Sequence, residues 1–177
     1  MEPTELERFE AIVLPHLDSA WGLARFLMRD DADAEDVVQE ACLRALRYIH
    51  GFRGEGAREG RAWLLTIVRN MAHTWRGRRQ AEGSTVAFDE GLHGTEPEAA
   101  DAADHELGRR EARETVGQAL ARLPADLREV IVLRELEGLS YKEIADVAGV
   151  PIGTVMSRLS RARKRLQGAL ASSGKDG

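Results

Sequence analysis

Cationic side chains gather in one stretch near the C-terminal end of the sequence, "VPIGTVMSRLSRARKRL" at 150–166. The stretch holds four arginines, one lysine and no acidic residue, although the chain as a whole has a formal net charge of −5. Guanidinium and ammonium groups at this density bind anions, and nucleic-acid phosphates are anions at regular spacing. A charge run alone is also typical of a solvated helix surface, so the surrounding pattern has to decide between the two.

The residues around this stretch separate by type on a helical wheel. One face carries Val155, Leu159, Ala162, Leu166 and Ala169, and another carries Arg158, Arg161 and Arg165, with Ser157 and Lys164 alongside. Upstream, Ala145 permits a close helix crossing and Gly149 supplies a tight turn. The spacing predicts a helix-turn-helix over 140–160 and favours DNA contact over a solvated surface.

A second basic segment lies at 61–79, with five arginines and no acidic residue. Trp63 and Trp75 are interleaved with the arginines. Arginines and aromatic rings together suit single-stranded or melted nucleic acid, where bases stack on the rings. Trp63 continues an apolar stripe and is expected in the core. Trp75 lies among polar neighbours, which leaves both an exposed functional role and a structural one open.

The apolar periodicity predicts an all-α fold, because apolar residues recur at helical spacing along both halves of the chain and no segment alternates as a strand does. The low content of aromatic residues also favours helix over strand. Pro15 is expected to bend or break the first helical segment, and Asp33 is a possible N-cap of the second. Ser140 and Glu143 form a predicted capping box. The expected helical segments are 4–29, 33–49, 61–79, 109–122, 124–138, 140–149 and 151–170.

An acidic segment divides the chain into two domains. Residues 80–108 contain eight acidic residues and neither lysine nor arginine. Few large apolar side chains and several glycines predict a flexible linker here. The expected organisation is therefore a helical domain at 1–79, the acidic linker at 80–108 and a helix-turn-helix domain at 109–177.

Several function classes are excluded by the composition. One cysteine, Cys42, allows no internal disulfide and indicates a reducing cytoplasm. No signal peptide or membrane-spanning segment is apparent, so we expect no membrane insertion. The five histidines are scattered and no phosphate-binding glycine motif is present, which predicts no catalytic site, no metal and no cofactor.

Two stretches resemble a known family. "DADAEDVVQEACLRAL" followed by "RAWLLTIVRNMAHTWRGRR" resembles the second conserved region of bacterial RNA polymerase sigma factors. "LARLPADLREVIVLRELEGLSYKEIADVAGVPIGTVMSRLSRARKRL" resembles the fourth region. With a short linker in place of the third region, the chain is similar to the extracytoplasmic-function (ECF, group IV) sigma factors of the sigma-70 family over nearly its whole length.

The resemblance implies three sets of contacts. Core polymerase, through the clamp helices of its largest subunit, would meet Asp36, Gln39, Glu40 and Arg44. Seven residues would bind the minus-ten element: Arg69, Asn70, His73, Trp75, Arg76, Arg78 and Arg79. Asn70 would be the main polar residue that recognises its bases. The minus-35 element would be bound by Arg128, Lys142, Thr154, Ser157, Arg158, Arg161, Lys164 and Arg165.

Three residues depart from the pattern of the family that the chain resembles: Cys42 stands where an aromatic residue is common, and Met156 and Ser160 stand where basic or aromatic residues are common. The resemblance predicts promoter melting, a stress regulon and an anti-sigma factor as partner. The acidic linker would either be attracted to basic polymerase surfaces or merely stay soluble and avoid the DNA. Two other functions remain open: a helix-turn-helix regulator that works without polymerase, and a sigma mimic that sequesters an anti-sigma factor.

Overall fold

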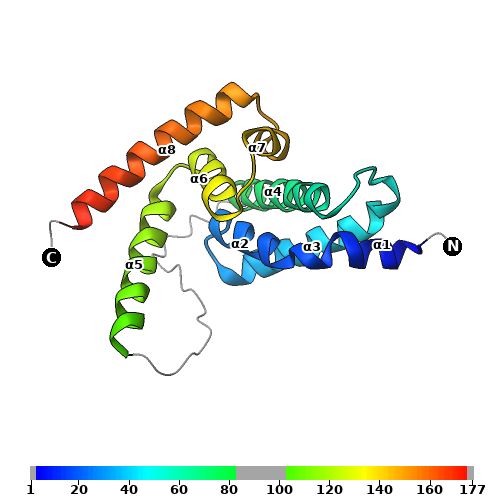
Figure 1. Cartoon of the computed structure of the whole chain (residues 1–177), viewed down its shortest axis with the longest axis horizontal. Helices are drawn as coiled ribbons and strands as arrows, with labels where there is room; N and C mark the ends of the chain where they lie inside the picture. Colours follow the sequence, from blue (N-terminus) through cyan, green and yellow to red (C-terminus); the bar gives the residue numbers. More distant parts are fainter. Residues whose placement is uncertain (1–2, 83–102, 175–177) are drawn as a thin grey trace.

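The computed structural model describes residues 3–82 and 103–174, without the side chains of 103 and 104. All the regular elements in these ranges are helical, which confirms the all-α prediction (Figure 1). The expected linker, 80–108, is helical at both ends, because 80 and 81 continue one helix and 103–108 begin the next. Its central part, and most of its acidic residues, lie outside the described residues.

The first domain has four α-helices, and Pro15 ends the first of them as predicted. Its elements are α1 (Glu5–Ile12), a 3-10 turn (Leu14–His16), α2 (Leu17–Leu27), α3 (Asp31–Tyr48) and α4 (Ala57–Ala81). Asp33 does not cap α3, since Asp30 accepts a hydrogen bond from the amide of Ala32 and is the N-cap. Asp33 is instead buried one turn further along and pairs with Arg79 at 2.7 Å.

The core of this domain lies between α2, α3 and α4, where Leu23, Val37 and Leu64 are fully buried. Gly60 lets α4 start directly against α1. A Cβ at position 60 would lie 2.9 Å from the carbonyl oxygen of Ile12, closer than real Cβ contacts allow. The absence of a side chain at Gly60 therefore fixes where α1 and α4 meet.

The second domain consists of α5 (Ala103–Arg122), α6 (Ala125–Ile131), α7 (Tyr141–Ala148) and α8 (Ile152–Ser173), with a π-helical turn (Val132–Leu136) after α6. The capping box of Ser140 and Glu143 is present, as predicted. Gly149 ends α7 with φ +67°, a left-handed conformation that favours glycine. Helix α5 begins six residues earlier than the sequence indicated.

The two domains pack together. α6 and the turn after it lie against α2, and α7 lies against α4, so that one buried apolar cluster runs through both domains. In Figure 1 α7 and α8 occupy the upper edge of the molecule and α3 the lower part. Polar contacts cross the same seam, where Arg58 of α4 pairs with Glu143 of α7 at 2.8 Å.

Candidate nucleic-acid interface

Helices α7 and α8 form the helix-turn-helix predicted from the sequence. Ile144, Val155 and Leu159 are fully buried between them, and Ala145 is buried at their crossing. The left-handed Gly149 makes the turn between the two helices. The outer face of α8 is consequently held in a fixed orientation by its own buried face.

The basic residues of α8 fall into two groups. Arg161, Lys164 and Arg165 are exposed, which leaves them available for an anion. Arg158 lies 3.8 Å from Asp126 of α6 and Arg163 pairs with Glu135 at 2.9 Å. The second group therefore also holds α8 against α6 and the turn after it. Of the predicted polar contacts, Thr154 is half-buried, and its carbonyl accepts a hydrogen bond from the exposed Ser157.

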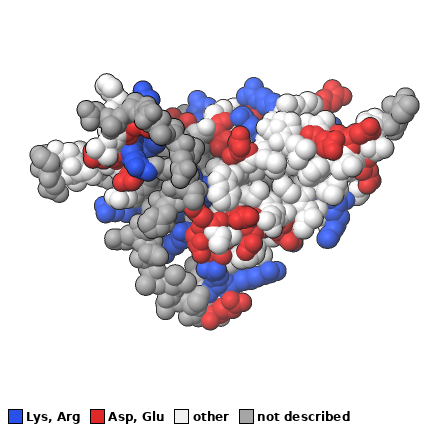
Figure 2. Space-filling model, turned by 90° about the horizontal axis from the view of Figure 1, so that it is seen from below, with Lys and Arg blue, Asp and Glu red and all other residues white. Residues whose placement is uncertain are grey.

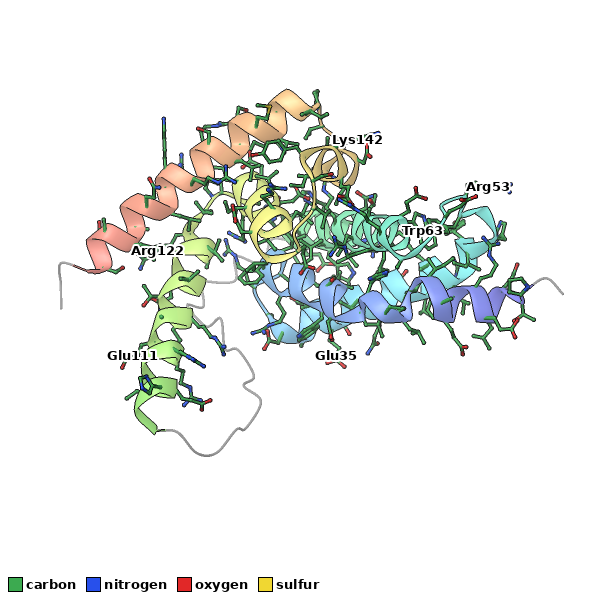
Figure 3. The ribbon with its side chains drawn as sticks, viewed as in Figure 1. Glu35, Arg53, Trp63, Glu111, Arg122 and Lys142 are labelled. Atoms are coloured by element: carbon green, nitrogen blue, oxygen red, sulfur yellow. The ribbon has the colours of Figure 1, made fainter. Side chains whose placement is uncertain are left out.

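Lys142 is exposed on the first turn of α7 at the upper edge of the molecule (Figure 3). Arg128, expected beside it as a phosphate contact, lies elsewhere. Its guanidinium is buried and donates hydrogen bonds to the carbonyls of Leu120, Ala121 and Leu123 at the end of α5 and of Phe26 in α2. Burial, together with neighbouring arginines, lowers the pKa of Arg128 to about 10, so it stays charged at neutral pH. In this structure Arg128 holds helix ends together and faces no solvent.

The predicted minus-ten residues of α4 lie on two different sides of that helix. Asn70 and Arg78 are exposed on one side, together with Thr74, which the sequence analysis did not single out. The Thr74 hydroxyl donates to the carbonyl of Asn70, one turn away. Thr74 was detectable from its helical phase, since residues four apart share a helix face.

The other side of α4 faces the second domain, where Arg69, His73 and Arg76 surround Glu129 of α6. The Arg69 Nε donates to Glu129 Oε1 at 2.5 Å, and the His73 Nε2 lies 3.6 Å from the same oxygen. Glu129 is fully buried, and its Oε2 has no hydrogen-bond partner among the residues that the structure describes. Burial is the main cause that lowers the pKa of Arg76, and Glu129 opposes that shift. Three predicted DNA contacts are therefore turned toward a carboxylate of the same chain.

The two tryptophans of the basic helix differ less than expected. Trp63 is half-buried against the core cluster, and its ring lies 4.9 Å from that of Phe52, centroid to centroid, in a tilted arrangement. Trp75 is also half-buried and packs against the core cluster, so it has the structural role that the sequence left open and is only partly exposed to solvent. Arg79, expected on a phosphate, is paired with Asp33.

The residues expected to meet polymerase lie on α3. Asp36, Gln39 and Glu40 are exposed, and Arg44 lies 3.6 Å from Glu40. Leu43 and Leu46 are also exposed on this helix and were missed, although their phase relative to Gln39 was readable from the sequence. Seen from below, the first domain shows acidic and uncharged side chains with few basic ones (Figure 2). The surface is thus polar and acidic with apolar residues between.

No three histidine, cysteine or carboxylate side chains lie close enough to hold a metal within the ranges 3–82 and 103–174. Among the helices that the structure describes, none combines the length and apolar character needed to span a bilayer.

Comparison with known proteins gives two family matches, one to each domain and in the same order along the chain. The sigma-70 region 2 model matches residues 12–82, and the sigma-70 region 4 model matches residues 113–166. RNA polymerase sigma-H factor of Pseudomonas aeruginosa is 38% identical over 92% of this chain and 86% of its own length. The ECF RNA polymerase sigma-E factor of Haemophilus influenzae is 39% identical over 82% of this chain and 77% of its own. The chain belongs to the ECF sigma factors of the sigma-70 family.

Two solved structures resemble this sigma factor along most of its length. The sigma factor RpoE from Bartonella quintana, in complex with the anti-sigma factor NepR, has a TM-score of 0.72 and 33% identity, over 90% of this chain and 94% of that one. CnrH, in complex with the cytosolic domain of CnrY, has a TM-score of 0.62 and 28% identity, over 93% and 88%. The family's region 2 and region 4 thus correspond to the two domains described above.

Proposed function

We propose that this sigma factor binds core RNA polymerase through α3, recognises a minus-35 element through α7 and α8, and recognises and helps to melt a minus-ten element through α4. The observation that carries the proposal is the opposite placement of the two surfaces. Glu35 of α3 and Lys142 of α7 lie at the lower and upper edges of the molecule (Figure 3). The two surfaces also belong to different domains, so polymerase and promoter can be bound at once in the packed arrangement or in an open one.

The α3 surface suits a protein partner better than DNA. Asp36 and Glu40 would repel phosphates, whereas the exposed Leu43 and Leu46 offer apolar area to bury against another protein. We place the clamp helices of the largest polymerase subunit on this surface, with Gln39 and Arg44 as further polar contacts.

The helix-turn-helix surface suits duplex DNA. Arg161, Lys164 and Arg165 are exposed on α8, and Lys142 is exposed on α7. Phosphate contacts of this kind give affinity that falls steeply with salt. A recognition helix enters the major groove with its N-terminal half, which places Thr154 and Ser157 nearer the bases.

The minus-ten role of α4 requires the domains to separate. Asn70 and Arg78 already face solvent, but Arg69 and His73 are held against Glu129. We propose that the packed arrangement belongs to the free chain and that polymerase binds an open one. We place the domains at 1–79 and 109–177 with the acidic linker 80–108 between them.

We further propose an anti-sigma factor as a partner, a stress regulon and a cytoplasmic location, with no membrane insertion and no enzymatic activity of its own. The similarity to RpoE from Bartonella quintana, whose structure was solved with the anti-sigma factor NepR, supports the first of these. No cofactor is proposed.

Gel filtration with core polymerase, followed by run-off transcription, tests the function. Co-elution and a specific transcript are expected. Leu43→Asp should abolish co-elution, whereas Leu6→Asp on α1, at a similarly exposed leucine, should not. Duplex binding without co-elution would show a regulator that works without polymerase. Binding to an anti-sigma factor alone would show a decoy, and either result would overturn the proposal.

A further inference from the structure

The N-terminal half of α8 carries an uncharged strip. Ile152, Gly153, Met156, Ser157 and Ser160 are all exposed, and their spacing puts them on adjoining rows of one helix side. The strip lies beside the buried row of Val155 and Leu159. Met156 is 54% exposed and Ile152 is 44% exposed, and these two side chains form the apolar part of the strip.

Cations border this strip without entering it. Lys142 is exposed on the neighbouring helix, and Arg161 and Lys164 are exposed further along α8. Arg158, the arginine that follows Ser157, is drawn toward Asp126 on another side of α8. Charge of this sign at the rim favours a nucleic acid as the occupant and disfavours a basic protein partner.

An uncharged strip limits which bases can be recognised. Bidentate recognition of guanine in the major groove requires arginine or lysine, and bidentate recognition of adenine requires asparagine or glutamine. The strip contains none of these residues. The distinct groups that it offers are apolar side chains and two hydroxyls, and the apolar feature of the major groove is the 5-methyl group of thymine.

We propose that Met156, with Ile152 beside it, recognises thymine methyl groups in the upstream promoter element and so sets the base preference of this sigma factor. The proposal rests on the proposed function of α8. The buried Val155 and Leu159 hold the helix, so Met156 reaches a defined position in the groove. Ser157 and Ser160 can bond to several bases and add little discrimination.

The experiment uses the full chain with core polymerase and a pool of duplexes that is randomised over the upstream element. After selection, each thymine is replaced in turn by deoxyuridine, which lacks only the methyl group. At one or two positions this change should weaken binding about fourfold, the value expected for one buried methyl group. With Met156→Ala the ratio of thymine to deoxyuridine affinity should fall to about one at the position that Met156 contacts.

Leu170→Ala is the matched control, because Leu170 is 39% exposed on the same helix but lies near its C-terminal end. It should leave the ratio unchanged. Three results would each overturn the inference: that selection favours no thymine, that deoxyuridine binds as well as thymine, or that Met156→Ala leaves the ratio of the two affinities unchanged. Each of these results is compatible with normal transcription by the wild-type holoenzyme, so the proposed function would stand. If Met156→Ala weakened assembly with polymerase and left base preference intact, the strip would be a protein contact and the inference would be wrong. Failure of the wild-type chain to co-elute with polymerase would instead refute the proposed function.

Discussion

Replacing one buried carboxylate, in Glu129→Gln, should loosen the contact between the two domains. Glu129 belongs to the second domain, and its partners Arg69 and His73 belong to the first. The amide keeps the size of the side chain and removes its charge. Arg69 would then face a neutral group at the seam, and it would gain more by turning to water or to a nucleic-acid phosphate.

The burial of the pair sets the size of the effect. Exposed ion pairs contribute about 0–1 kcal/mol, whereas breaking a fully buried pair costs about 3–5 kcal/mol. Glu129 is fully buried, but the side chain of Arg69 is 21% exposed and keeps some hydration. We therefore expect a loss of about 2 kcal/mol in domain packing, which is about a 30-fold shift toward the open arrangement.

Small-angle X-ray scattering on the free chain measures this shift as an increase in the radius of gyration. Circular dichroism should stay the same, because no helix depends on the pair. Glu135→Gln is the matched control, since Glu135 pairs with Arg163 inside the second domain. Replacing both partners, in Arg69→Met with Glu129→Leu, should restore part of the compact form, because it removes the buried carboxylate together with its closest cationic partner. A compact Glu129→Gln variant, or an equal expansion in Glu135→Gln, would refute the reasoning.

Three further changes test the packing. Arg128→Ala should lower the free energy of unfolding by about 3 kcal/mol, because buried carbonyls lose their donor; thermal melting against the exposed Arg122→Ala measures it. The pKa of Glu143 is lowered to about 2, chiefly by Arg58 of α4, which donates hydrogen bonds to its carboxylate. The ionised carboxylate therefore stabilises the fold fully above about pH 4.5, and this contribution is lost as the pH falls toward 2. Glu143→Gln should flatten acid unfolding curves in that window, and an unchanged slope would contradict this. Gly60→Ala should destabilise by about 1–3 kcal/mol through a backbone clash, whereas Gly51→Ala, in open space, should be neutral in denaturant melts.

The features predicted from the sequence were those set by near neighbours along the chain. The capping box at Ser140 and the turn at Gly149 involve residues within four positions of each other. Residues 103–108, the start of α5, escaped prediction because Leu107 is the one large apolar side chain there, which leaves no apolar periodicity to detect. Asp33 was misplaced as a cap because several acidic residues lie within one turn, and only the distant Arg79 distinguishes it.

Residue type in the sequence did not reveal burial. Arg128 is of a residue type that commonly binds phosphate, but it lies among helix ends. One of the carbonyls that accept its hydrogen bonds, that of Phe26, is in the other domain. Arg69 pairs with Glu129, which is 60 residues away. Such pairs follow from how the domains pack, and a helical wheel of one segment carries no information about them.

In the proposed function, the division of the basic residues also implies an order of events in promoter binding. On α8 the outer cations Arg161 and Lys164 are exposed, so they would attract duplex DNA in the packed arrangement. On α4, Arg69 is neutralised by a carboxylate of the same chain. An arriving promoter would therefore meet the helix-turn-helix first. Under the same proposal, the part of the minus-ten surface that faces Glu129 would become available only when a partner supplies the free energy that separates α4 from α6. Polymerase bound at α3 would hold the first domain while that happens.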